Sequence, residues 1–120
     1  MLELIPNVPD NVLAVTATGK VTKEDYEEVI FPALEKKAKD HSKLRLLYHV
    51  SPEYTGITGG GLYEDDKVGR KYFFSFEKIA VVTGKNSIRN AIKAFGWMMP
   101  GEKKIFGAAE LDDALAWIVD

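Results

Sequence analysis

The chain has 120 residues, of which 46% are hydrophobic and 28% charged, a size and composition typical of one globular domain with its own core. It contains no cysteine, which excludes a disulfide framework, a thiolate zinc site and a cysteine nucleophile. The net charge of −2 argues against nucleic acid as a partner, because nucleic-acid binders usually carry a basic face. The first residues lack the pattern of a signal peptide, and no apolar run approaches the roughly 18 residues of a membrane span, so we expect a cytoplasmic protein without a transmembrane segment.

The chain is expected to open with two strands at a sheet edge. Residues 2–5 form a short apolar segment that is followed by Pro6 and Pro9. Residues 12–18 alternate in part between apolar and polar side chains and end at Gly19, which is typical of a strand. Turn-forming residues lie between the two segments, which are therefore predicted to pair antiparallel.

The first helix is expected to begin near Thr22. An acidic residue, Asp25, follows three positions later, which resembles a capping box with aspartate in place of glutamate or glutamine. Apolar side chains at helical spacing extend the helix to about Asp40. Pro32 removes one backbone hydrogen bond, so a kink is predicted near Glu28.

An apolar run over residues 44–50 predicts a buried strand in the middle of the chain. Turn-forming residues 51–57 follow, and then Thr58 and the glycines 59–61 precede a charged segment with the pattern of a helix up to about residue 76. Open α/β sheets bind ligands at the carboxyl ends of their strands, so we expect the functional surface where this central strand ends.

Four further elements complete the chain. A nearly continuous apolar run over residues 78–83 predicts a strand buried on both faces. A helix over residues 87–95, a short strand over residues 104–107 and an amphipathic helix over residues 111–118 follow. The alternation of strands and helices predicts an α/β fold, with residues 1–120 as a single domain. Its sheet is expected to have five strands, mostly parallel with an antiparallel edge, and four helices.

Short segments along nearly the full length carry a family resemblance. They are Leu4–Pro6, Pro9–Val12, Gly19–Thr22, Asp25–Tyr26, Pro32–Glu35, Arg45–Tyr48, Phe76–Val82, Lys93–Gly96, Met99–Glu102, Ala109–Asp112 and Ala116–Trp117. Together they resemble the STAS domain, the fold of bacterial anti-sigma factor antagonists. More closely, the chain is similar to the small SpoIIAA-like proteins, which are also described as STAS and CRAL-TRIO lipid-transfer relatives. None of the segments is a catalytic signature.

The resemblance implies two kinds of activity. The antagonists bind another protein and are switched by phosphorylation of a serine at the start of the helix after the third strand, whereas the lipid-transfer relatives hold an apolar ligand. The antagonists carry aspartate and serine followed by a small residue and glycine. Here the corresponding segment is Ile57-Thr58-Gly59-Gly60, so Thr58 takes the acceptor position without the preceding aspartate.

Thr58 and its glycines also have two interpretations that do not depend on the family. Free backbone N–H groups at a helix start can hold an anion. Alternatively, Thr58 caps the helix and the glycines allow the chain to turn. The acidic triplet 64–66 spreads around a helix and is expected to be a solvated first turn, so no metal site is predicted. His49 has no evident catalytic partner in the sequence.

Aromatic and apolar residues are more numerous around the predicted loop and second helix than one core-facing stripe can bury. Three consecutive aromatics, residues 72–74, span about 200° of a helix, so Phe74 is predicted to face a partner or a ligand. The excess side chains form a binding surface or complete the core. The candidate binding residues are Tyr54, Ile57, Thr58, Gly59, Gly60, Tyr63, Phe74, Trp97 and Met98.

These observations predict a non-catalytic, STAS-like interaction or regulatory module that self-associates as a homodimer or binds another protein. The alternative is a carrier or sensor of a lipid or other apolar small molecule, held beside the helix that starts near Gly60. No catalytic motif, cofactor or metal is predicted.

Overall fold

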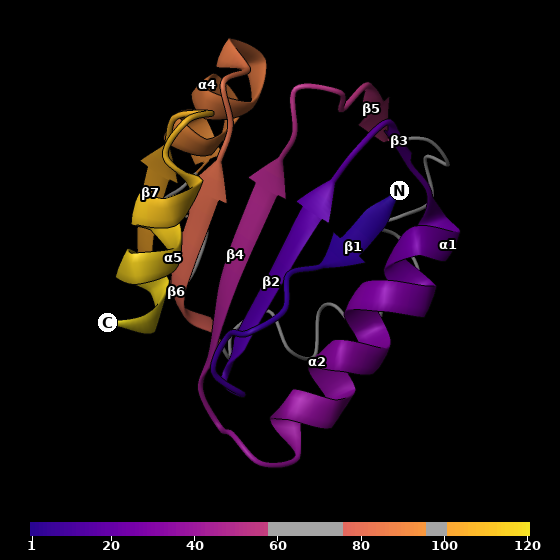
Figure 1. Cartoon of the computed structure of the whole chain (residues 1–120), viewed down its shortest axis with the longest axis vertical. Coiled ribbons are helices and arrows are strands. Elements are labelled where there is room, and N and C mark those ends of the chain that lie inside the picture. The colour runs from indigo at the N-terminus through magenta and orange to yellow at the C-terminus, as the bar shows by residue number, and fades with distance from the viewer. Residues whose placement is uncertain (58–75, 96–100) are drawn as a thin grey trace.

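A five-stranded sheet forms the centre of the computed structural model, which describes residues 1–57, 76–95 and 101–120 (Figure 1). In sheet order the strands are β1 (Leu2–Leu4), β2 (Val12–Ala17), β4 (Leu44–Val50), β6 (Phe76–Val82) and β7 (Glu102–Phe106). β1 pairs antiparallel with β2, and the other pairs are parallel. The predicted α/β fold, with its mostly parallel sheet and antiparallel edge, is confirmed.

Three helical stretches accompany the sheet in the described residues. The first runs through α1 (Lys23–Asp25), η1 (Tyr26–Ile30) and α2 (Phe31–Ala38), and the others are α4 (Asn86–Phe95) and α5 (Leu111–Val119). They match three of the four predicted helices. The fourth, expected after Gly60, falls outside the described residues.

The first helical stretch contains one turn of π-helix, η1. The backbone N–H of Phe31 donates to the carbonyl of Tyr26, five residues back, instead of four. Pro32 has no N–H with which to continue the regular pattern to Glu28. The irregularity predicted near Glu28 is therefore present as a π-helical turn, and the helix ends at Ala38, two residues before the predicted end.

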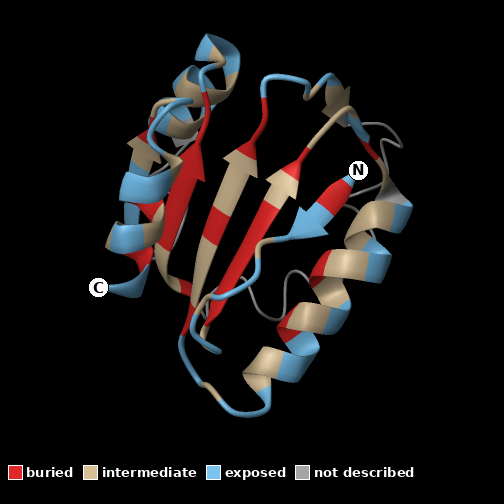
Figure 2. Ribbon diagram, viewed as in Figure 1, coloured by how far each residue is buried: buried red, intermediate tan, exposed pale blue. Residues whose placement is uncertain are grey.

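Each face of the sheet carries its own core. Side chains from one face pack under η1, α2 and α4; the buried ones include Leu13, Val15, Leu44, Ile79, Val81, Ile30 and Leu34. On the opposite face α5 covers a second cluster, which includes Val12, Ala14, Leu47, Ala80, Val82, Phe106, Ala114 and Ile118. Figure 2 shows the buried residues gathered on the central strands, as parallel strands with both faces covered require.

A two-stranded parallel ladder lies beside the main sheet and was not predicted. It joins β3 (Lys20–Val21) to β5 (Gly56–Ile57). Gly56 has a φ of 130°, a conformation that side chains other than glycine rarely adopt. The glycine therefore allows the chain to turn into β5.

Gly101 also occupies a position that only glycine fits. Its φ is 72°, and a Cβ atom there would lie 2.5 Å from the carbonyl oxygen of Glu77. Gly19 provides a matched comparison, because its φ is 57° but no atom lies within 4 Å of the site of its Cβ. Both positions are left-handed, and only Gly101 is also crowded.

Replacing Gly101 with alanine is expected to lower the free energy of unfolding by more than the same change at Gly19. Gly19→Ala carries the left-handed strain of about 1–2 kcal/mol. Gly101→Ala adds the displacement of the backbone at Glu77. Urea unfolding of the two variants measures the difference, and equal losses would show that the β6–β7 edge accommodates the methyl group.

Candidate functional site

The loops that follow β2 and β4 are bound to each other at the carboxyl edge of the sheet. The backbone N–H of Ser51 donates to the carbonyl of Ala17 at 3.0 Å. Gly19 donates to Glu53 at 3.0 Å and accepts from Thr55 at 2.8 Å. The β3–β5 ladder continues this pairing outward. The two loops therefore form one hydrogen-bonded platform, and the chain leaves it after Ile57.

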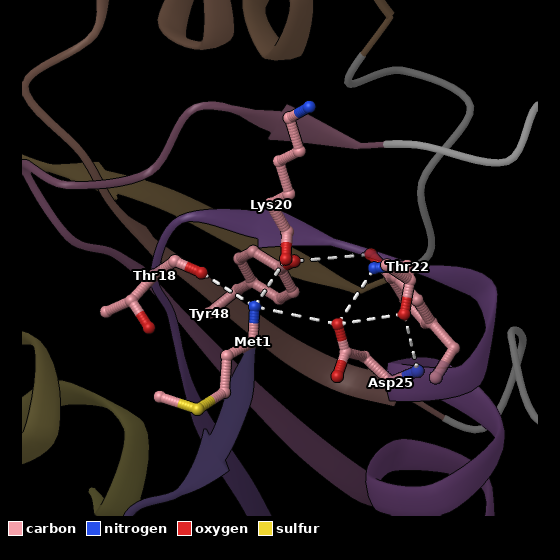
Figure 3. A network of polar contacts seen from close by, with 7 residues as sticks. Met1, Thr18, Lys20, Thr22, Asp25 and Tyr48 are labelled. Atoms are coloured by element: carbon pink, nitrogen blue, oxygen red, sulfur yellow. Dashed lines mark hydrogen bonds and ion pairs between the residues drawn. The ribbon is translucent and has the colours of Figure 1, made fainter.

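A capping box at this platform starts the first helix (Figure 3). The backbone N–H of Thr22 donates to Asp25 Oδ2 at 2.8 Å, and the N–H of Asp25 donates to Thr22 Oγ1 at 3.2 Å. The backbone hydrogen bond from Thr22 is the main reason why the pKa of Asp25 lies below its usual value, and burial opposes it. The predicted capping box is confirmed.

The amino group of Met1 joins the same network. It lies 3.5 Å from Asp25 Oδ2 and donates to the carbonyl of Thr18 at 2.7 Å and to the carbonyl of Lys20 (Figure 3). This group thereby links β1, the end of β2 and the start of α1. The polar groups of this corner bind one another, so the corner is a structural clamp.

A small hollow lies between the carboxyl ends of β4 and β6 and the loop after β7. Its volume is about 230 Å³, and its lining includes Ser51, Gly84 and Lys85. Thr83 beneath it is fully buried, and its hydroxyl accepts the backbone N–H of Lys85 at 3.1 Å. Arg89 Nη1 donates to the carbonyl of Thr83 at 3.3 Å, which fixes the first turn of α4. Hydrogen bonds thus tie the loop beside this hollow to the end of β6 and to α4.

A polar pair lies on the face of the sheet that α5 partly covers. Thr16 and His49 are direct partners in the β2–β4 register, and Thr16 Oγ1 lies 3.2 Å from His49 Nδ1. Burial lowers the pKa of His49, so the neutral imidazole is favoured. The sequence showed no partner for His49, because a contact between residues 33 positions apart depends on strand register.

A larger hollow is a groove between β1 and the helix η1–α2. Its volume is about 570 Å³. Its apolar lining consists of Leu2, Leu4, Val29, Pro32 and Ala33. Charged residues at its margins are Glu3, Asp10, Glu28, Lys36 and Lys37. This groove could not be identified from the sequence, because it depends on how the edge strand packs beside the helix.

A family model described as SpoIIAA-like matches residues 12–119. The chain belongs to the SpoIIAA-like family. It is similar to the crystal structure of an uncharacterized protein of the DUF3478 family with a SpoIIAA-like fold from Shewanella loihica PV-4, with a TM-score of 0.74 and 28% sequence identity over 98% of this chain and 92% of that chain. No curated protein matches its sequence. The resemblance inferred from the short segments is confirmed.

The described part of this SpoIIAA-like chain contains two of the predicted binding residues. Tyr54 is half-buried and packs against the core beneath α2, so part of its side chain contributes to the fold. Ile57 is the last residue of β5. The other candidates lie outside the described residues, and their roles stay predictions: Thr58, Gly59, Gly60, Tyr63, Phe74, Trp97 and Met98.

Two further properties of the SpoIIAA-like chain concern metals and membranes. Within residues 1–57, 76–95 and 101–120, no group of three or more histidine, aspartate and glutamate side chains could hold a metal ion. In the same residues, no helix has the length and apolar character needed to cross a membrane.

Replacing His49 with asparagine is expected to change how stability depends on pH. Burial holds the folded-state pKa of His49 below its unfolded value of about 6.5. Protonation therefore favours the unfolded chain, and the free energy of unfolding should fall as pH drops through about 6.5. The fall should level off below the folded-state pKa.

Urea unfolding of wild type and His49→Asn between about pH 5 and 8 measures this contribution. The wild-type free energy of unfolding should fall more steeply on acidification than that of the variant. His41 is present in both proteins and serves as an internal control. Parallel curves would show that the burial of His49 does not affect its titration.

Proposed function

We propose that this SpoIIAA-like chain is a non-catalytic interaction module that binds proteins, including a second copy of itself, at the carboxyl edge of its sheet. The observation that carries this proposal is the platform made by the loops after β2 and β4. Hydrogen bonds of 2.8–3.0 Å and the β3–β5 ladder hold these loops together. A surface that is already ordered loses little entropy on binding, which favours recognition of a partner.

The polar side chains of this edge support the same proposal. The Ser51 hydroxyl accepts the backbone N–H of Glu53 at 3.1 Å, and the Thr83 hydroxyl accepts that of Lys85 at 3.1 Å. Asp25 is engaged by Thr22 and by Met1. Each of these groups stabilises the conformation of a loop. A surface made of such loops is ordered before a partner binds, which favours docking. A nucleophile or base would instead need a hydrogen-bonded partner that activates it.

The binding surface of this proposal includes the residues that follow β5 in the sequence. Thr58 comes directly after Ile57 and is the candidate phosphoacceptor. Tyr63, Phe74, Trp97 and Met98 supply the aromatic and methionine side chains that are enriched in protein interfaces. We infer that a homodimer in the cytoplasm is the working form.

Replacing Phe74 with serine is expected to weaken self-association and leave the monomer folded. The three consecutive aromatics 72–74 span more of a helix than a core-facing stripe covers, and Phe74 is the one predicted to lie outside that stripe, so little intramolecular burial should be lost. Sedimentation equilibrium measures the dimer, and urea unfolding measures the monomer.

Phe106→Ser is the matched control, because Phe106 is only 5% exposed and belongs to the core beneath α5. Emptying a buried phenylalanine site typically costs about 3–5 kcal/mol. The control should therefore lose far more unfolding free energy than Phe74→Ser. If the two variants lose the same amount, Phe74 is a core residue and the surface assignment is wrong.

The alternative function is a carrier or sensor of an apolar small molecule, which the many aromatic and apolar residues around the helix predicted after Gly60 favour. The alternative itself places the ligand beside the helix that starts near Gly60. Native mass spectrometry of protein purified from cells should then show a bound lipid-sized mass. Protein that is consistently empty, with no thermal shift in fatty acids or phospholipids, would contradict the carrier.

A further inference from the structure

β1 presents an unused backbone edge. The Ile5 N–H donates to Ala14 of β2 at 2.8 Å, and the Met1 carbonyl accepts at 2.9 Å from Thr18, the residue after β2. Glu3 lies between Met1 and Ile5 in the antiparallel register. Alternate residues of a strand point their backbone groups to opposite sides. The N–H and C=O groups of Leu2 and Leu4 therefore point away from β2, and within the described residues no hydrogen bond uses them.

The groove beside this edge has apolar side chains on both of its walls. One side of the helix lines it with Val29, Pro32 and Ala33, which are spaced by three and four residues and so share a face. Leu4 on the opposite wall is 53% exposed, a large apolar surface for a strand residue. The groove thus combines apolar walls with a row of free donors and acceptors.

We propose that this groove binds an extended peptide segment of a partner protein, which adds to β1 as a further strand. Backbone hydrogen bonds to Leu2 and Leu4 would supply affinity, as in other cases of strand addition. Side chains of the peptide would alternate between the two faces of the strand. Those on the groove side are apolar, because they pack between Leu4 and α2. The residue between them lies on the side of Glu3 and is basic.

The charges at the groove support a basic residue at that position. Glu3 lines the groove, and in the described part of the chain it has no ion-pair partner. On the helix side the lining carries both Glu28 and Lys36, so the charges there favour neither sign. Asp10 is already paired, because its carboxylate lies 2.9 Å from His41 Nε2 and 4.0 Å from Lys37 Nζ. Opposite charges across a strand pair stabilise it, and like charges destabilise it.

The same rule disfavours a second copy of this chain as the occupant. An antiparallel pair of β1 strands that uses both Leu2 and Leu4 would place Glu3 directly opposite Glu3 of the other copy. A lipid is disfavoured for a different reason. An acyl chain in the groove would cover the free N–H and C=O groups without bonding to them, which is costly.

This inference concerns the β1 edge and does not depend on the proposed function of the carboxyl edge. Its failure would leave the dimer test with Phe74→Ser unaffected. A peptide of known sequence serves as the probe, and amide hydrogen exchange of the full chain reports the two surfaces separately.

The probe is a capped five-residue peptide, threonine-leucine-arginine-leucine-threonine, and its control has glutamate in place of arginine. Titration followed by NMR should show the arginine peptide binding at least about fivefold more tightly than the glutamate peptide, the effect of about 1 kcal/mol of cross-strand charge pairing. Glu3→Lys should reverse this preference. Binding should also protect the Leu2 and Leu4 amides from exchange, whereas the Glu3 amide is protected in the free protein as well.

Leu4→Pro is the second variant. It removes an N–H that the β1–β2 ladder does not use, and edge strands tolerate proline there, so the fold should persist while peptide affinity falls at least about fivefold. Three outcomes would overturn the inference. The first is that wild type and Glu3→Lys each bind both peptides equally. The second is that the peptide binds without protecting the Leu2 and Leu4 amides. The third is that these amides become protected without peptide, either when the protein concentration is raised or when lauric acid is added.

Discussion

The burial of both faces of β2 is the constraint on which the rest of this structure depends. All of its residues except Thr16 are buried, and the next two strands of the sheet, β4 and β6, are apolar along most of their length. Such strands must be covered on two sides, and the connection from β2 to β4 crosses one face of the sheet as the helix η1–α2. The parallel strands then end at one edge. That geometry brings the loops after β2 and β4 together and creates the platform from which the chain continues into residue 58.

The antiparallel strand β1 has a different role. It pairs with β2 on one side only, so it is an edge strand whose other side is unpaired in the described residues. The core under η1 and α2 takes in Leu2, which is 3% exposed, but leaves Leu4 open. The helix stands beside the free backbone edge without bonding to it, and a groove results. The two candidate surfaces thus belong to different parts of one sheet: the loops lie at the carboxyl ends of the parallel strands, and β1 is one of the two edge strands, with β7 at the opposite edge.

Much of the fold could be predicted because it follows from local patterns. The apolar run over residues 78–83 identified β6, and the spacing of Thr22 and Asp25 identified the start of the first helix. The β3–β5 ladder could not be predicted, since two residues carry no period. The contact of Thr16 with His49 depends on register between distant strands, which the sequence does not reveal. Of the candidate site, Tyr54 has a role in the core in addition to any role in binding.

Glu3 explains how an unpaired strand can remain available to a partner. An exposed strand edge tends to pair with another copy of itself, and natural proteins counter this with charges and short strands. β1 has three residues and carries Glu3 at its centre, so self-pairing would oppose two carboxylates. The same carboxylate attracts a basic side chain on a foreign strand. Pro32 contributes an apolar ring to the other wall of the groove. The groove is therefore closed to a second copy by charge and open to a peptide of the opposite charge.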